Sequence, residues 1–121
     1  MHNFRELKIW NESMQLAKEI YVITKTFPIS EQYNLTSQIN RSVISIPSNI
    51  AEGAGRNSDK EFSHFLSIAL GSCFELETQI TLSYSLGYLK EENFNLIIEL
   101  TTKLQKMIHG FKKSISTKSF A

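Results

Sequence analysis

Three groups of residues in this chain have types and spacings that could do chemistry. Glu61 and His64 stand three residues apart, the spacing by which one helix of a bundle supplies two ligands to a di-iron site. Such a site needs a second pair of this kind and two further glutamates. Neither His2 nor His109 follows a glutamate by three residues. The ligand count therefore fails, and we expect no metal and no cofactor.

The second group comprises the residues that could act as nucleophiles or cradle a phosphate. The single cysteine, Cys73, has no histidine at helical spacing and falls in an apolar row, where a thiol keeps its proton and reacts slowly. The glycine-containing turn at residues 53–56 lacks the lysine and serine order of a phosphate-binding loop. We therefore expect no enzymatic activity and no small-molecule substrate.

The third group is a polar stripe, whose members recur at intervals of three and four and so share one helical face. The stripe consists of Arg41, Ser45, Asn49, Glu52 and Arg56. One interpretation is a hydrogen-bond network between helices or subunits, with Glu52 pairing with Arg56 one turn later. The other is a surface that binds RNA or a partner protein. We favour the structural interpretation, because small polar residues beside Pro47 have a freed backbone carbonyl to satisfy.

Apolar residues recur at helical intervals along the whole chain, and no alternating strand pattern competes. Pro28 ends the first predicted helix, and Ser30 is placed to cap the second. Ser58 and Glu61 form a capping box at the start of the third, which Gly87 ends. The pattern predicts helices over 4–27, 31–53, 59–86 and 91–115.

The second predicted helix contains Pro47, which removes one backbone N–H and disfavours α geometry at the preceding residue. Apolar residues before and after the proline stay in phase, so we expect a bend at Pro47 and a helix that continues beyond it. The glycines at 53 and 55 can take the positive φ of a C-cap and are expected to end this helix.

Four helices joined by short links favour an all-α fold, an antiparallel up-down-up-down four-helix bundle. At 121 residues the chain suits a single domain over 1–121, with the last few residues frayed. It shows neither a charged-then-apolar leader nor an apolar run of about 18 residues. We therefore expect a cytoplasmic protein without membrane contact.

The string SIPSNIAEGAGR at 45–56, followed by SDKEFSHFLSIALGSCFELETQ and LGYL, carries a family resemblance. It resembles the four-helix-bundle family whose founders are encoded in intervening sequences of bacterial 23S ribosomal RNA genes, and which includes an accessory protein of diversity-generating retroelements. The motif residues are Pro47, Asn49, Glu52 and Gly53. The resemblance implies a homopentamer in several members, no known catalytic activity, and nucleic-acid association in some. This chain departs from the family at Asn40-Arg41, where two basic residues are usual.

Surplus apolar width on the helices supports the oligomer that the resemblance implies. The two apolar rows of the first helix together span roughly 200°, wider than one core-facing stripe requires. We expect neighbouring subunits to cover the second row and part of the last helix. The predicted interface consists of Ile9, Leu16, Ile20, Ile23, Leu96, Leu100 and Met107.

Basic residues are unevenly distributed along the chain. The net charge is +1, yet residues 100–121 hold five lysines and no acidic residue, so the remainder carries −4 (1 − 5). In an up-down bundle, one pole gathers basic residues from four helix ends. The predicted nucleic-acid contacts are Arg5, Lys8, Arg56, Lys60, Lys112 and Lys113 at this basic pole, with Arg41 on the polar stripe. Favourable interaction with helix C-termini is the competing role for such lysines.

These patterns together predict a non-enzymatic, homo-oligomeric four-helix bundle that associates with structured RNA or a nucleic-acid-handling protein through its basic pole. The alternative is a structural or protein–protein interaction module that binds no nucleic acid. An enzyme using a metal or a thiol inside the bundle is the weakest hypothesis.

Overall fold

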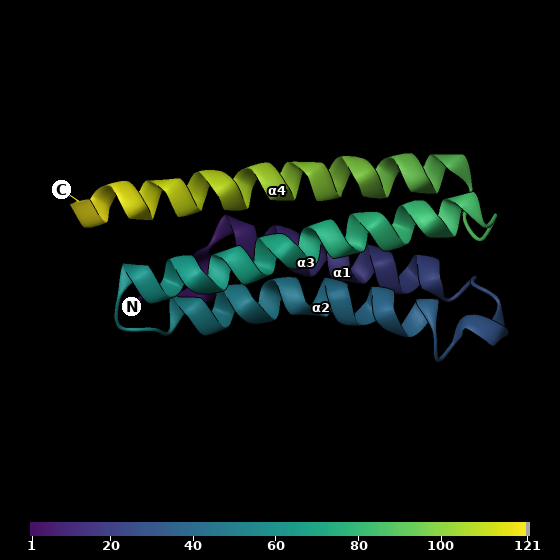
Figure 1. Ribbon diagram of the computed structural model, residues 1–121, viewed down its shortest axis with the longest axis horizontal. Coiled ribbons are helices and arrows are strands. Elements are labelled where there is room, and N and C mark those ends of the chain that lie inside the picture. The colour runs from purple at the N-terminus through teal and green to yellow at the C-terminus, as the bar shows by residue number, and fades with distance from the viewer. Residues whose placement is uncertain (121) are drawn as a thin grey trace.

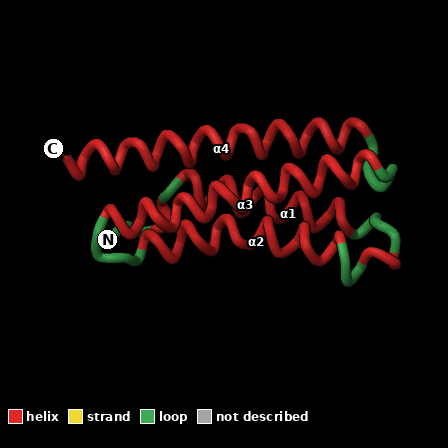
Figure 2. The backbone as a smooth tube through the Cα atoms, in the orientation of Figure 1, coloured by secondary structure: helices red, strands yellow, loops and turns green. Residues whose placement is uncertain are grey.

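The computed structural model of the chain describes the backbone of residues 1–120 and the side chains of residues 1–116. Four long helices run side by side, and within this described part no strand is present (Figures 1 and 2). The elements are η1 (Phe4–Glu6), α1 (Lys8–Thr24), η2 (Ile29–Glu31), α2 (Leu35–Ala54), α3 (Asp59–Ser85) and α4 (Glu91–Phe120). The predicted all-α four-helix bundle is confirmed.

Each helix packs against its two neighbours in chain order, and α4 closes the bundle against α1. In the described residues, α1 and α3 lie diagonally across the core, as do α2 and α4. The start of α1, the end of α2, the start of α3 and the end of α4 share one pole (Figure 1). None of the helices described is long and apolar enough to cross a membrane.

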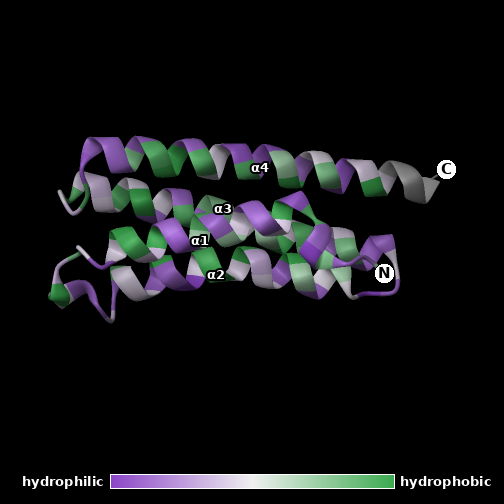
Figure 3. Cartoon of the chain, turned by 180° about the vertical axis from the view of Figure 1, so that it is seen from behind, coloured by the Kyte–Doolittle hydropathy of each residue, from purple (hydrophilic) through white to green (hydrophobic). Residues whose placement is uncertain are grey.

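The core is built from aliphatic side chains that each helix contributes from one face. Figure 3 shows hydrophobic and hydrophilic residues side by side along every helix, the pattern of an amphipathic bundle. The largest fully buried side chains are Phe62, Ile20, Ile39, Ile46, Ile50, Leu66, Leu76, Ile80, Ile97, Leu104, Ile108 and Val43. Cys73 is buried among them, as its place in the apolar row predicts.

The first predicted helix is divided in the structure. Residues 4–6 form the 3-10 turn η1, Leu7 is extended, and α1 begins only at Lys8. The Asn11 side-chain amide donates to the carbonyls of Arg5 and Leu7, at 3.0 Å each, and so satisfies both groups at the break. The helical end of α1 at Thr24 falls three residues before the predicted end at 27.

The predicted start of the second helix at residue 31, with Ser30 as its cap, is wrong. Residues 29–31 form a separate 3-10 turn, and α2 starts at Leu35 after Asn34, whose backbone is non-helical. Tyr88 holds the turn in place, because its hydroxyl donates to Glu31 at 3.1 Å. This long-range contact overrides the local capping signal.

The helix α2 continues through Pro47 to Ala54, so the predicted continuation past the proline is confirmed. The helix ends at the predicted glycine-containing segment with Gly55 as its C-cap, but the predicted positive φ is wrong, because Gly55 has a φ of −83°. Gly53 is instead required by packing. A Cβ at Gly53 would lie 2.7 Å from the Phe65 Cβ and 2.8 Å from a Phe62 ring carbon. The glycine allows α2 and α3 to cross closely.

Both predicted ends of α3 are confirmed. The Ser58 hydroxyl accepts from the Glu61 N–H at 3.1 Å, which is the predicted N-cap. The Glu61 carboxylate accepts from the same hydroxyl at 3.3 Å, not from the Ser58 backbone N–H, so the reciprocal half of the predicted capping box is not formed. Gly87 has a φ of +81°, and the bonds from Gly87 N–H to Tyr84 and from Tyr88 N–H to Ser83 complete a Schellman motif.

The last helix, α4, starts at Glu91 as predicted and continues to Phe120, beyond the predicted end at 115. Its C-terminal end projects past the other three helices (Figure 1). The fraying predicted for the last few residues falls on side chains 117–120 and on residue 121, which lie outside the described residues.

Candidate nucleic-acid interface

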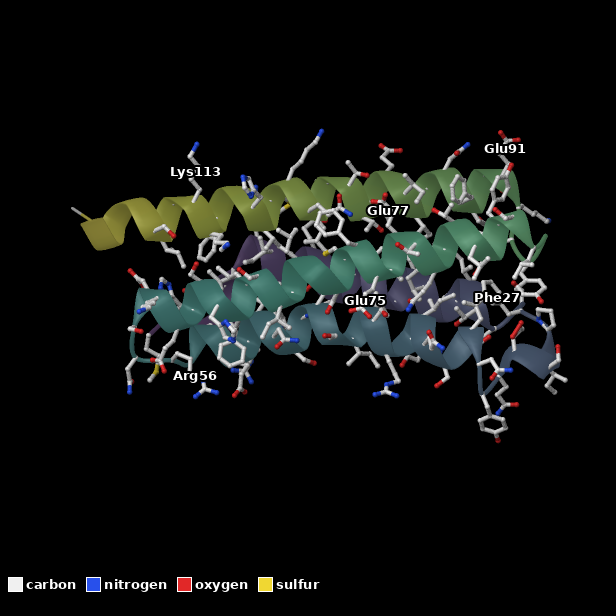
Figure 4. The ribbon with its side chains drawn as sticks, in the orientation of Figure 1. Phe27, Arg56, Glu75, Glu77, Glu91 and Lys113 are labelled. Atoms are coloured by element: carbon white, nitrogen blue, oxygen red, sulfur yellow. The ribbon has the colours of Figure 1, made fainter. Side chains whose placement is uncertain are left out.

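Six of the seven predicted nucleic-acid contacts lie at one pole of the bundle. Arg5 lies in η1, Lys8 starts α1, and Arg56 follows α2. Lys60 lies in the first turn of α3, and Lys112 and Lys113 lie in the C-terminal third of α4. Figure 4 shows Arg56 and Lys113 at this end and Phe27 and Glu91 at the other. Arg41, the seventh, is exposed near the middle of α2 and away from the basic pole.

The chain's N-terminus holds the elements of the basic pole together. The His2 N–H donates to the Ala54 carbonyl at the end of α2 (2.9 Å). Its ring contacts Phe62 on α3 and Phe111 on α4, at centroid distances of 5.0 and 6.2 Å. Its Nε2 lies 3.7 Å from the Asp59 carboxylate. Sequence reasoning missed His2, because a residue outside a helix takes part in no periodic pattern.

Acidic residues reduce the charge of the basic pole, and most of them have local partners. Glu52 pairs with Arg56 at 2.6 Å, Asp59 lies beside His2, and the Glu61 carboxylate accepts from the Ser58 hydroxyl. With Glu6 added, four acidic side chains stand against six basic ones, a net of +2 (6 − 4). The pole is therefore moderately basic, and Lys8 and Lys60 are both exposed to solvent.

Arg56 at the basic pole is held by two contacts. Besides its bond to Glu52, its guanidinium lies 4.7 Å from the centre of the Phe65 ring, within cation–π range. A surface hollow of about 550 Å³ adjoins it. The hollow is lined by Arg56, Lys60, Glu61, Ser63, His64, Phe65 and Ser67. Cationic, hydroxyl and aromatic groups of this kind can contact a phosphate and its nucleotide.

The polar stripe on α2 makes the hydrogen-bond network that the structural interpretation predicts. The hydroxyls of Ser45 and Ser72 lie 2.8 Å apart and join α2 to α3. The Asn49 amide donates to the Ser45 carbonyl at 2.8 Å and to its hydroxyl at 3.0 Å. Asn40, where the family usually has a basic residue, accepts from the Thr24 hydroxyl of α1 at 3.1 Å. This position therefore supports helix packing.

The predicted subunit interface is corrected by the burial of α1. Ile9, Leu16, Ile20 and Ile23 are 0–7 % exposed and belong to the core of the single chain. The four residues are covered by the chain's own helices, so they are unavailable to a neighbour. On α4, Leu100 and Met107 are half-buried against the core, and Leu96 is exposed.

Exposed or half-buried apolar side chains line two grooves that sequence reasoning missed. A groove of about 670 Å³ between α2 and α3 is lined by the exposed Phe74, Leu82 and Leu86 together with Gly71. A second groove, of about 430 Å³, follows the seam between α1 and α2 and contains Trp10, Met14, Ala17 and Ile44. The sequence signal that could have shown the first groove is the spacing of Phe74, Leu82 and Leu86 by multiples of four residues, on the face of α3 away from its core row.

The structure offers little to support metal or thiol chemistry. In the described residues, no group of three or more potential ligands is close enough to hold a metal ion. Burial raises the pKa of the Cys73 thiol to about 12, and the neighbouring Glu77 carboxylate adds to the rise. The thiolate is therefore scarce near neutral pH.

The comparisons with known proteins agree with this architecture. A sequence model of the family described as 23S rRNA-intervening sequence protein matches residues 5–110. The chain is also similar to a crystal structure from Bacteroides thetaiotaomicron, described as a protein with unknown function from the S23 ribosomal protein family. That pair shares 29 % identity and a TM-score of 0.79, and the alignment covers 87 % of this chain and 98 % of the other. No curated protein matches the chain.

Proposed function

Because the chain belongs to the 23S rRNA-intervening sequence protein family, we propose that it is a non-enzymatic, homo-oligomeric bundle that contacts structured RNA through its basic pole. The observation that carries the proposal is the gathering of six basic side chains from four separate segments at one end of the molecule. A protein that handles nucleic acid is the second form of partner that this surface suits.

The charge pattern supports contact with phosphates more than with bases. Positive side chains at the basic pole come from helix ends and short turns, and such groups hold phosphate oxygens without reading sequence. Most aromatic residues of the chain pack in or against the core, and the described residues form no exposed sheet on which splayed bases could stack. The expected binding is electrostatic and weakly sequence-specific.

Assembly would strengthen a surface that is only moderately basic in one chain. A ring of parallel copies places every basic pole on the same side, so the fields of the copies add and can reach several kT. Five copies are expected from the family resemblance. The proposal therefore couples RNA contact to oligomerisation.

A salt titration of RNA binding tests the proposal. The probes are a fluorescent RNA hairpin and an unstructured polyuridine of equal length, and binding is followed by anisotropy. The double variant Lys8→Gln and Lys60→Gln should bind both RNAs more weakly. The slope of log affinity against log salt should become shallower by about 0.7 to 0.9 for each lost phosphate contact.

The matched control is the double variant Lys90→Gln and Lys103→Gln, which removes the same charge from exposed lysines outside the basic pole. It should leave the slope and the affinity close to those of the parent. Equal losses in both double variants would show that net charge alone matters. Absence of RNA binding by the parent at low salt would overturn the proposal.

A protein–protein interaction module is the second candidate function, and the exposed apolar side chains favour it. Phe74 is 53 % exposed, and Leu82 and Leu86 are about half exposed on the same face of α3. Contiguous apolar surface of this kind is characteristic of protein contact sites. This candidate does not require the basic pole to bind RNA.

A further inference from the structure

The face between α2 and α3 has the features of a helix-docking surface. Its groove is open to solvent, and Phe74 projects from the middle of α3 with more than half of its surface exposed. Gly71 lies one turn earlier, and nothing lies within 4 Å of where its Cβ would be. Since no contact inside the chain requires a glycine there, the position is open to the close approach of another backbone.

The seam between α1 and α2 has the complementary shape. Met14 and Ala17 on α1 and Ile44 on α2 line a groove near the middle of both helices. Ile44 is 45 % exposed. The seam therefore presents an apolar hollow at the level where α3 presents Phe74 on the other face.

Resting on the proposed homo-oligomer, we infer that Phe74 on the α2–α3 face of one copy inserts into the α1–α2 seam of a second copy of this chain. The contact is heterologous, because each copy uses one face to donate Phe74 and a different face to receive it.

Charge complementarity supports a second copy as the occupant. The α2–α3 groove is bordered by two carboxylates, Glu31 and Glu75, and Figure 4 shows Glu75 at the middle of α3 beside α2. On α1, Lys18 follows Met14 by four residues, so it lies beside the seam. Lys25 has the same relation to Tyr21. Parallel copies place Lys18 near Glu75, and Lys25 near Glu31 at the far pole.

The arrangement of the bundle determines the shape of the assembly. The two contact faces share the helix α2, and adjacent faces of a four-helix bundle meet at about a right angle. A heterologous contact that turns each copy by about a right angle closes into a ring of about four copies, and a somewhat smaller turn gives the five copies that the family resemblance implies. The shared helix α2 points toward the ring axis, with Arg41 on its exposed face, and α4 points outward.

Two variants, each blocking one face, test the contact. Phe74→Asp removes the donating face, and Ile44→Asp removes the receiving face. Light scattering at micromolar concentration should give 13.9 kDa for each variant alone and several times that mass for the parent. Mixing the two variants should give a particle of twice 13.9 kDa, because each supplies the intact face that the other lacks.

Leu96→Asp is the matched control, because Leu96 is exposed to a similar degree on α4, outside both faces. It should leave the parent's mass unchanged. Far-UV circular dichroism must show the same helicity for all three variants, which is expected because each altered residue is at least 40 % exposed.

Several outcomes would overturn the inference. A mixture that stays monomeric would show that the two faces do not pair. An Ile44→Asp variant that stays assembled would assign the contact to another surface, and dissociation by Leu96→Asp would assign it to α4. A monomeric parent would remove the oligomer as well, whereas the salt titration of RNA binding would still test the basic pole independently.

Discussion

The side of α3 that packs against α2, its inner face, and the side that is open to solvent, its outer face, differ in what surrounds the glycine at each. Toward α2, Phe65 packs so closely against Gly53 that a Cβ there would lie 2.7 Å from the Phe65 Cβ. Toward solvent, Gly71 has open space around it and stands beside an exposed phenylalanine. The inner glycine is explained by the fold of one chain. The outer one is unexplained by that fold, and an exposed glycine within a helix costs about 1 kcal/mol relative to alanine.

This contrast separates the residues that fold the chain from those available to assemble it. The inner face also contains the direct hydrogen bond between Ser45 and Ser72 and, separately, the buried thiol of Cys73. The outer face contains apolar side chains that no helix of the described residues covers. Substitutions on the inner face should therefore change the stability of the bundle, and those on the outer face should change association.

Gly53→Ala should have the largest effect of the substitutions that sharpen this contrast. The nearest obstacle is the Phe65 Cβ, which is fixed to the α3 backbone and cannot rotate away. Overpacking costs about 1–3 kcal/mol, and alanine recovers up to about 1 through helix propensity. Because this obstacle is fixed, the overpacking cost should lie in the upper part of its range, and a net loss of roughly 1–2 kcal/mol should be measurable by urea unfolding.

Gly55→Ala is the control for the inner crossing. Gly55 also lies at the end of α2, but its φ is negative and a Cβ there would make only ordinary contacts, at 3.6 Å or more. The free energy of unfolding of the Gly55→Ala variant should stay within about 0.5 kcal/mol of the parent's. A Gly53→Ala variant as stable as Gly55→Ala would contradict the close crossing.

The buried thiol of Cys73 should make the stability of the bundle fall at alkaline pH. Its pKa is raised from 9.0 to about 12 in the folded chain, first by burial and then by Glu77. The contribution of the protonated thiol to the free energy of unfolding is therefore complete below about pH 9 and is lost as pH rises toward 12. The loss should reach about 1.4 kcal/mol at pH 10.

Comparison with Cys73→Ala isolates this contribution, because the tyrosines titrate in both proteins. Tyr88 is one of them, and its hydrogen bond to Glu31 raises its pKa. The difference in unfolding free energy between parent and variant should shrink from pH 8 to pH 10. A difference that stays constant would show that the thiol ionises as readily in the folded chain as in the unfolded one.

The sequence predicted the fold well where local chemistry decides. The N-cap at Ser58 and the positive φ at Gly87 depend on residues a few positions apart, and both are confirmed. Ser30 failed as a cap, because Tyr88 holds Glu31 from a position 57 residues away. Contacts of such sequence separation leave no periodic signal in the residues around Ser30.

The candidate interfaces were harder to predict for a geometric reason. Helical spacing showed that α1 has two apolar rows, yet it could not say which row faces the chain's own core. Ile20 is fully buried, whereas Tyr21 and Val22 beside it are exposed. The prediction of the basic pole depended only on the order of the helices, so the sequence was enough to place its six residues at the same end of the bundle.

The Ser45–Ser72 hydrogen bond should contribute a smaller part of the inner crossing. A double-mutant cycle of Ser45→Ala and Ser72→Ala should give a coupling energy of about 1 kcal/mol, typical of a part-buried hydrogen bond. Ser67→Ala on the outer side of α3 is the comparison, because its hydroxyl bonds only to the Ser63 carbonyl of its own helix. A coupling energy near zero would remove this bond as a link between α2 and α3.

The smallest expected change is at Gly71, and it should have the opposite sign. In a Phe74→Asp background, Gly71→Ala should raise the free energy of unfolding by roughly 0.5–1 kcal/mol, because alanine favours an exposed helix and meets no neighbour. Gly110→Ala on α4 should do the same, since its Cβ would also lie in open space.

In the assembling parent the two substitutions should differ in their effect on dissociation of the oligomer. Gly71 lies beside the inferred contact of Phe74, so a Cβ there should shift dissociation to higher protein concentration, measured by light scattering on dilution. Gly110 lies on α4, and its substitution should leave dissociation unchanged. Identical dissociation by both variants would show that no second backbone approaches Gly71, and a fall in stability with Gly71→Ala would show that the outer face is constrained by the chain's own fold.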